Sequence, residues 1–244
     1  MPASSALQAL APTGTLRCGV VIAPAASAFF AINKGGAPQG VTVDLFAALG
    51  RDLNVPVELV AFPNSGELTE ATSRGDIDVA FMPQDAERAR KVDFGPPYIL
   101  IESTFLVPSG SALTHLKDAN FKGARAIAIA GTTTGRSARK FLTNGTVEDV
   151  RGVDDMVRMA KAGDGDLFAL SRDSFATLLP DLPGARVLEG NFQEVGVAVA
   201  VPKDRAEALK IATAFVEGAK RSGIVRAALD RAGFAECAVA PPAG

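Results

Sequence analysis

The sequence predicts an α/β protein with two lobes, each a mostly parallel sheet flanked by helices, and two strands that join the lobes. Short continuous apolar runs alternate along the chain with stretches whose apolar residues recur at helical spacing. This alternation is typical of parallel β-α-β units, and it occurs in two separate blocks. Extended apolar runs at residues 102–107 and 195–201 lie between the blocks, so we expect each to cross from one lobe to the other.

The first block predicts three strands and three helices. Residues 16–23 form a continuous apolar run, as in a buried strand. Glycine at position 75 ends one predicted helix, and Asp85 is placed to accept hydrogen bonds from the exposed N–H groups that open a short helix. The predicted strands are 16–23, 55–62 and 77–82, and the predicted helices are 43–53, 67–74 and one that opens at residue 85.

The second block repeats this pattern, and a helical C-terminal part follows it. Residues 205–221 place Leu209, Ala212 and Val216 on one face, which predicts a long amphipathic helix. Residues 224–232 predict a final turn or two of helix, and residues 234–244 a frayed tail. The predicted strands of the second block are 124–130, 146–151, 166–171 and 185–188, and its predicted helices are 135–142 and 153–162.

The two crossing strands make the first lobe discontinuous. We expect lobe 1 to comprise residues 1–105 and 200–244, and lobe 2 to comprise residues 106–199. A two-strand connection makes a hinge rather than a rigid joint. Open α/β proteins bind ligands at the carboxyl ends of their strands, so we expect the ligand in the cleft between the lobes.

The composition excludes several classes of function. The 244 residues carry a net charge of −2 and are 48% hydrophobic, which is ample for a core and excludes a largely disordered chain. Interspersed charges and a pI near 5.6 argue against a nucleic-acid partner. The longest apolar runs are too short to span a bilayer. Residues 1–15 lack the pattern of a signal peptide, which leaves open an exported mature form and a cytoplasmic protein.

Side chains for catalysis or metal binding are scarce. His115, the one histidine, lies in a polar stretch that predicts a surface loop. Cys18 lies inside a strand-like run, where a small buried thiol is the simplest explanation, so we expect Cys18 and Cys237 to be free thiols. We expect no metal and no cofactor, because the acidic pairs fall at turns and helix starts, where aspartate caps backbone N–H groups. These acids are Asp44, Asp76, Asp78, Asp154, Asp155, Asp164 and Asp166.

Five motifs follow one another between residues 13 and 233. They are GTLRCGVV at 14–21, GVTVDLFAAL at 40–49, GDID at 75–78 with ER at 87–88, VDFGPPY at 92–98, and VAVPKD at 199–204. The series resembles the bacterial extracellular solute-binding proteins, family 3, of the polar amino-acid type. The resemblance implies a type II periplasmic-binding-protein-like fold that closes on a small carboxylate-bearing solute. It also implies a periplasmic location and a membrane permease of the ATP-binding-cassette type as partner, and we expect a monomer.

The resemblance implies ligand-binding residues in lobe 1. Arg88 matches the family arginine that pairs bidentately with a ligand carboxylate, a contact worth about 1.5–3 kcal/mol. The alternative is an ordinary exposed helix arginine. Phe29 matches a position that often holds an aromatic ring over the ligand, and Phe30 would then turn into the core. The alternative is that both rings lie in the core. We expect the cleft to be more apolar than is usual in the family, whose members commonly have hydroxyl-bearing residues at these pocket positions. Here the positions hold Phe81, Met82 and Pro83.

In lobe 2, the GTTTG segment at residues 131–135 matches a family loop at a helix start. The hydroxyl and N–H groups of Thr132, Thr133 and Thr134 would hold an anion at the positive end of the helix dipole, and simple helix capping is the alternative. Ser171 stands where amino-acid-binding members place an aspartate for the α-ammonium group. A serine cannot neutralise a buried ammonium, whose unpaired burial costs several kcal/mol. An amine-free acid and an amino acid, with Asp173 as its partner, both stay open.

Two other functions compete with that of a non-enzymatic transport component. The cyclohexadienyl dehydratases are similar to this family and carry a catalytic acid in the lobe-2 part of the cleft. Here that segment, residues 171–174, is SRDS, in which Asp173 is the one candidate acid. Turnover of prephenate or arogenate would identify such an enzyme. A sensory ligand-binding module is the second alternative, and the upstream genomic sequence would reveal it.

Overall fold

Strands β6 (Val92–Val107) and β11 (Gln193–Pro202) each contribute residues to both of the units into which the chain divides. The structure is a computed structural model that describes residues 8–22 and 29–242. The expected lobe boundaries, near residues 105 and 199, fall inside these two strands. Of the described residues, unit 1 contains 8–22, 29–100 and 196–242, and unit 2 contains 101–195.

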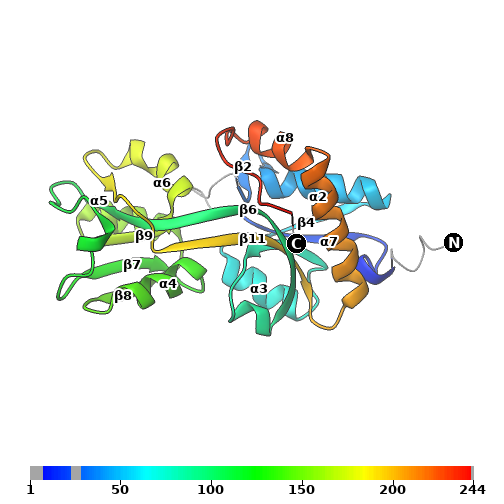
Figure 1. Cartoon of the computed structure of the whole chain (residues 1–244), viewed down its shortest axis with the longest axis horizontal. Coiled ribbons are helices and arrows are strands. Elements are labelled where there is room, and N and C mark those ends of the chain that lie inside the picture. Colours follow the sequence, from blue (N-terminus) through cyan, green and yellow to red (C-terminus); the bar gives the residue numbers. More distant parts are fainter. Residues whose placement is uncertain (1–7, 23–28, 243–244) are drawn as a thin grey trace. The chain divides into compact units, whose positions relative to one another are not determined.

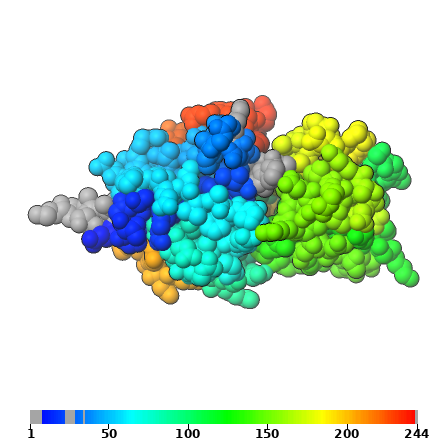
Figure 2. Space-filling model, turned by 180° about the vertical axis from the view of Figure 1, so that it is seen from behind, coloured from blue at the N-terminus to red at the C-terminus, as the bar shows by residue number. Residues whose placement is uncertain are grey.

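Unit 1 is discontinuous in sequence, and the space-filling view shows this directly. Orange and red C-terminal residues lie on the same body as blue and cyan N-terminal residues (Figure 2). Both units have parallel strands flanked by helices (Figure 1), so the predicted α/β fold class is confirmed. Long-range packing, rather than sequence proximity, therefore assembles the first unit.

The sheet of unit 1 has the strand order β4-β1-β5-β11. Strand β1 pairs in parallel with β4 on one side and β5 on the other, and β11 pairs antiparallel with β5. The carboxyl ends of the three parallel strands therefore form the kind of edge where open α/β sheets bind ligands. The elements are β1 (Leu16–Val21), β2 (Ile32–Lys34), β3 (Ala37–Gln39), α2 (Val41–Leu53), β4 (Val57–Phe62), α3 (Ser65–Ser73), β5 (Val79–Pro83), η1 (Arg88–Arg90), α7 (Ala206–Arg221) and α8 (Ile224–Arg231).

A glycine in β1 allows α3 to lie directly on the sheet. A Cβ atom on Gly19 would lie 2.2 Å from Leu68 Cδ1, closer than real Cβ contacts, and 3.2 Å from Ile77 Cγ2, which is unusually tight. Leu68 and Ile77 are both fully buried in the core beneath α3. The small residue in the predicted strand is thus a requirement of helix-on-sheet packing.

A buried ion pair closes the amino end of this sheet. The Asp78 carboxylate, whose side chain is fully buried, accepts hydrogen bonds from Arg17 N (3.0 Å) and Nε (2.9 Å) through Oδ2, and from Nη2 (2.6 Å) through Oδ1. The hydrogen bond that the Arg17 guanidinium donates to Asp78 raises the pKa of Arg17, with burial opposing it. Asp78 was expected to cap N–H groups at a turn. It does accept one backbone N–H, but that of Arg17 at the start of strand β1 rather than one of its own loop.

Unit 2 repeats this arrangement with the strand order β6-β9-β7-β8. Strand β7 pairs in parallel with β8 and β9, whereas β6 pairs antiparallel with β9. Asp166 accepts from Arg125 N (2.8 Å) just as Asp78 does from Arg17, but at an exposed position. The elements are η2 (Leu116–Asp118), β7 (Arg125–Ile129), α4 (Thr133–Phe141), β8 (Thr146–Val150), α5 (Val153–Ala162), β9 (Leu167–Ser171), α6 (Arg172–Leu178), η3 (Leu179–Asp181) and β10 (Arg186–Val187), which pairs with β6.

Side-chain alternation along β7 and β9 gives unit 2 two cores. Ile127 and Phe168 lie on the face covered by α5 and α6, and Ala126 and Leu167 lie on the face covered by α4. Alanines line the α4 face, so this helix approaches the sheet closely. The predicted continuous apolar runs thus correspond to strands that are buried on both faces, as in parallel sheets.

Several expectations about local structure are wrong. Strand β6 begins at Val92 rather than at residue 102, and the helix α6 was not expected. Asp85 accepts from Arg88 N (2.9 Å) as expected, but the helix that follows is a single 3-10 turn. Asp44 does not cap α2, whose N-cap is Gly40. It pairs instead with Arg231 of α8 (2.6 Å), because the tertiary fold brings that helix beside α2.

The C-terminal segment was expected to fray, yet it is docked on unit 1. The Phe234 ring stacks on Phe29 with centroids 3.7 Å apart. Val239 forms a bridge with Ile99 of β6, and the N–H of Ala240 donates to the Tyr98 carbonyl (2.9 Å). A sequence window around two prolines carries no sign of these long-range contacts.

We expect Phe234→Ala to lower the free energy of unfolding by about 2 kcal/mol, because it removes a half-buried ring and the stacking of that ring on Phe29. Urea denaturation measures this change, and hydrogen exchange at the Ala240 amide should accelerate. Phe121→Ala, which alters a ring 38% exposed in unit 2, is the matched control and should shift stability by less than about 0.5 kcal/mol. Equal losses of stability in the two variants would contradict the packing of the C-terminal segment on unit 1.

Cys18 and Cys237 are not joined by a disulfide, as expected. Burial raises the pKa of the Cys18 thiol, so this strand residue is chemically inert at neutral pH. Within the described part of the chain, no helix combines the length and apolar character needed to cross a bilayer. Over the same residues, no group of three or more His, Cys, Asp and Glu side chains is arranged to hold a metal ion.

Candidate functional site

Arg88 lies at the carboxyl edge of the unit 1 sheet, shortly after β5. Its side chain is 2% exposed, so the alternative of an exposed helix arginine is wrong. Nη1 donates to the carbonyl of Pro83 (2.6 Å) and Nη2 donates to Ser65 Oγ (2.6 Å). Ser65 is the first residue of α3, whose N-cap Asn64 accepts from Glu67 N (2.9 Å). The guanidinium is therefore held between the end of β5 and the start of α3.

Ser65 is a site residue that the sequence reasoning missed. The available signal was its position directly after β4, at the same edge as the end of β5. Because serines at helix starts commonly serve as caps, the sequence alone does not indicate that this hydroxyl binds Arg88. Here Asn64 caps the helix, and the hydroxyl of Ser65 instead accepts from Arg88.

The three residues of β5 that were expected to line a pocket are placed differently. Phe81 packs against Phe46 and Tyr98 with ring centroids 5.0 and 5.3 Å apart. Met82 points to the other face, where its sulfur accepts from Thr69 Oγ1 (3.2 Å). Strand alternation sends both side chains into the core rather than to the edge. Pro83 contributes through its carbonyl oxygen, which holds Arg88.

The Phe29 ring lies in the core, as the stated alternative has it, and Phe30 is the less buried of the two. The Phe29 ring is 3% exposed and stacks on Phe234, and its carbonyl accepts from Tyr98 Oη (2.5 Å). Phe30 is only partly buried, and its carbonyl accepts from Thr42 Oγ1 (2.9 Å). The docked C-terminal segment supplies the stacking partner that holds the Phe29 ring in the core.

At the carboxyl edge of unit 2, the threonines of the GTTTG segment take different roles. Thr132 is the N-cap of α4: its hydroxyl accepts from Gly135 N (3.0 Å) and donates to the Ile129 carbonyl (2.7 Å). Thr133 is 2% exposed. Capping, the alternative named above, thus accounts for Thr132. Only Thr134 directs its hydroxyl to another element, where Oγ1 lies 3.0 Å from Ser103 Oγ.

Four hydroxyl groups from four elements meet at this edge, and we call them the hydroxyl row. Ser103 of β6 is the register partner of Ser171 at the end of β9, and Ser171 Oγ lies 2.9 Å from Ser174 Oγ of α6. Ser103 is fully buried, and Ser171 and Ser174 are 9% and 8% exposed. Antiparallel register and two helix starts thereby gather polar groups that are distant in sequence. The hydroxyl row consists of Ser103, Thr134, Ser171 and Ser174.

Ser171 and Thr134 were expected at the site, whereas Ser103 and Ser174 were missed. A serine in a predicted crossing strand was the one available signal for Ser103, and α6 was not expected at all. Asp173 lies on the first turn of α6 and is partly buried.

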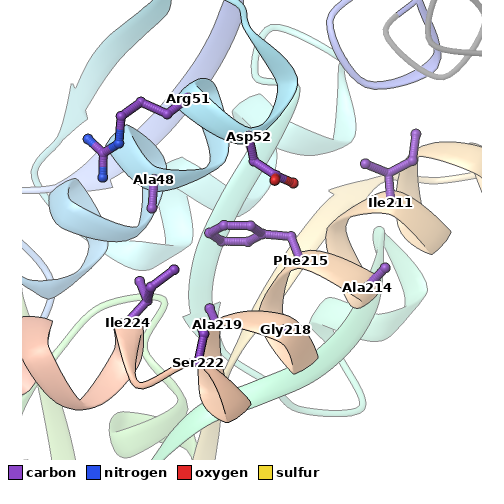
Figure 3. Close-up of a pocket in the computed structure, with 10 residues that line it drawn as sticks. All are labelled: Ala48, Arg51, Asp52, Ile211, Ala214, Phe215, Gly218, Ala219, Ser222 and Ile224. Carbon is purple, nitrogen blue, oxygen red and sulfur yellow. The ribbon is translucent and has the colours of Figure 1, made fainter.

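One groove of unit 1 lies away from this chemistry. It measures about 700 Å³ and lies between α2, α7 and the start of α8, with the Phe215 ring at its centre (Figure 3). Its charged groups, Arg51 and Asp52, belong to the exposed side of α2. Small apolar side chains form most of its walls, so it offers no array of polar groups for recognising a solute. The lining residues are Ala48, Arg51, Asp52, Ile211, Ala214, Phe215, Gly218, Ala219, Ser222 and Ile224.

A family model described as bacterial extracellular solute-binding proteins, family 3, matches residues 19–233. The match covers most of the chain and includes both the Arg88 edge and the hydroxyl row. A comparison with curated protein sequences found no significant match.

Solved structures of the same fold include a mutant of ArgBP from T. maritima, with 21% identity, a TM-score of 0.80 and coverage of 93% of this chain and 98% of that chain. The solute receptor for L-cysteine of Neisseria gonorrhoeae has 23% identity, a TM-score of 0.81 and coverage of 93% and 92%. The ancestral amino acid-binding protein AncCDT-1, a precursor of cyclohexadienyl dehydratase, has 23% identity, a TM-score of 0.79 and coverage of 92% and 98%. At these identities, the similarity establishes a shared fold.

Proposed function

Because the chain belongs to the bacterial extracellular solute-binding proteins, family 3, we propose that it captures a small carboxylate-bearing solute for an ABC-type importer. The observation that carries this proposal is the buried Arg88 guanidinium at the carboxyl edge of the unit 1 sheet. The solute is an amino acid or an amine-free organic acid. The protein acts as a binding component in the periplasm and performs no chemistry on the solute.

The setting of Arg88 suits a carboxylate. The Pro83 carbonyl and Ser65 hydroxyl each bind a different terminal nitrogen of the guanidinium, which fixes the orientation of its plane. A planar donor fork in a fixed orientation matches the two oxygens of a carboxylate. Preorganisation of this kind lowers the entropy lost when the solute binds. Arg88 thus provides the carboxylate recognition of the proposed site.

The polar groups that we propose for solute binding in unit 2 are those of the hydroxyl row. Its hydroxyls can donate and accept, and they lie beside the amino end of α4, where the helix dipole favours acceptors and anions. Relatives of this fold include the substrate-binding protein of an amino acid ABC transporter. By analogy with that protein, we infer that the solute-loaded form delivers to a membrane permease, which would be the protein partner.

A thermal-shift screen of the purified protein against small carboxylic acids, amino acids included, tests this function. A ligand at about 100 times its Kd adds roughly 2.7 kcal/mol of stability, which raises the melting temperature by several degrees. The methyl ester of each hit is the control, because esterification removes the charge that Arg88 binds. Esters that stabilise as well as the free acids would contradict carboxylate recognition, and an absence of any hit among the acids would contradict the function.

A further inference from the structure

We propose, as an extension that rests on the proposed function, that the solute presents a neutral hydrogen-bonding group to the hydroxyl row and carries no α-ammonium group. The solute class is then small carboxylic acids without an amine, with 2-hydroxy acids as the best-matched members. The observation that supports this proposal is the composition of the row. It consists of four hydroxyl groups, which form two pairs with oxygen–oxygen distances of 3.0 and 2.9 Å. Three of the four residues are no more than 9% exposed.

The chemistry of hydroxyl groups decides what this row can recognise. A serine or threonine hydroxyl has one donor hydrogen and two acceptor lone pairs, and the hydrogen rotates to suit its partner. In each of the pairs Ser103–Thr134 and Ser171–Ser174, either oxygen can be the donor. The pairs can therefore turn a donor or an acceptor toward a ligand without moving a heavy atom. A neutral hydroxyl or carbonyl group fits such adaptable partners.

A buried ammonium group needs a carboxylate partner, and the strands and helices that carry the hydroxyl row contain few carboxylates. Among the described residues of β6, β9, α4 and α6, the acids are Asp93, Glu102 and Asp173. Asp93 belongs to unit 1 and binds Lys203 (2.6 Å), and Glu102 binds Arg172 (3.3 Å). Both carboxylates are thus neutralised by cations of this chain. Asp173 is the one acid that competes with the proposal, and the experiment below tests it directly.

The surrounding charges also oppose an ammonium group. The row lies at the amino end of α4, where the helix dipole is positive. Arg136 and Arg139 lie on the same helix, and Arg139 is bound to Asp149 of β8 (2.6 Å). An ammonium group moved from water to this buried edge would exchange its hydration for neutral hydroxyl groups in the positive potential of the helix dipole, which is unfavourable. We therefore expect discrimination against the amine of at least tenfold.

The test compares each acid that binds with its 2-amino counterpart by isothermal titration, starting with L-malate against L-aspartate, 2-hydroxyglutarate against L-glutamate, and 2-hydroxyisovalerate against L-valine. In the unaltered protein, the hydroxy or unsubstituted acid should bind at least tenfold more tightly than the amino acid. Ser171→Asp should move this ratio toward the amino acid by at least tenfold. Ser171 occupies the N-cap of α6, a position that favours aspartate, so the variant should fold.

Ser109→Asp adds the same charge at an exposed position of unit 2 and should leave the ratio unchanged. Tighter binding of the amino acids by the unaltered protein would overturn this proposal while leaving the proposed function intact. Loss of that amino-acid binding in Asp173→Asn would then assign the ammonium to Asp173. If no carboxylic acid of either kind binds, the proposed function itself fails, and this inference fails with it.

Discussion

Asp78→Asn is expected to lower the free energy of unfolding by about 3 kcal/mol, the largest loss we expect from a single substitution outside the hydrophobic core. The Asp78 side chain is fully buried and accepts three hydrogen bonds from Arg17. Breaking a buried ion pair from one side costs about 3–5 kcal/mol. We expect the lower end of this range, because Arg17 is 25% exposed and can turn toward water.

Urea denaturation followed by circular dichroism measures the change as a shift of the midpoint. Asp76→Asn is the matched control, since Asp76 lies two residues away and pairs with Arg74 on the surface; exposed pairs contribute about 0–1 kcal/mol. Asp166→Asn, at the corresponding exposed position of unit 2, should be milder than Asp78→Asn. Equal losses for Asp76 and Asp78 would show that burial does not set the strength of this contact.

Arg88→Ala is expected to weaken binding of the carboxylate solute by roughly 30-fold, which corresponds to about 2 kcal/mol. The substitution removes the guanidinium that is held between Pro83 and Ser65. Arg88→Lys should recover part of this loss, because it restores the charge but not the bidentate fork. Isothermal titration with an acid identified in the thermal-shift screen measures both effects.

Arg90→Ala is the control for Arg88, because Arg90 lies on the same 3-10 turn with an exposed side chain. It should leave the affinity within twofold. Thermal unfolding without ligand separates lost binding from lost folding in the Arg88 variants. An Arg88→Ala protein that folds and binds within twofold of the unaltered protein would remove Arg88 from the proposed site.

Local pattern was sufficient for most of the secondary structure. The helix α5 begins and ends where its apolar spacing and Gly163 predict, and β1, β7 and β9 coincide with continuous apolar runs to within two residues at either end. These elements are specified by short-range rules: apolar periodicity, capping and glycine at a positive φ. The resemblance to a solute-binding family extended this result to the fold class, which the family model supports.

The candidate site was predictable only in part. Arg88 and Ser171 could be named as candidates because they stand at positions that the family resemblance marks. Ser65 and Ser103 could not, since each becomes a partner only when strands that are distant in sequence align. The sequence left the burial of Phe29 open for the same reason: its stacking partner is Phe234, about two hundred residues away.

The sequence by itself therefore determined most of the elements and the fold class, because these depend on residue type and local spacing. Only the tertiary structure decided which face each side chain takes. Strand alternation turned Phe81 and Met82 into the core, helix packing gave Asp44 an arginine of α8 as partner, and antiparallel register brought Ser103 beside Ser171. Long-range contacts of this kind form at a chain-closure cost that no local pattern encodes.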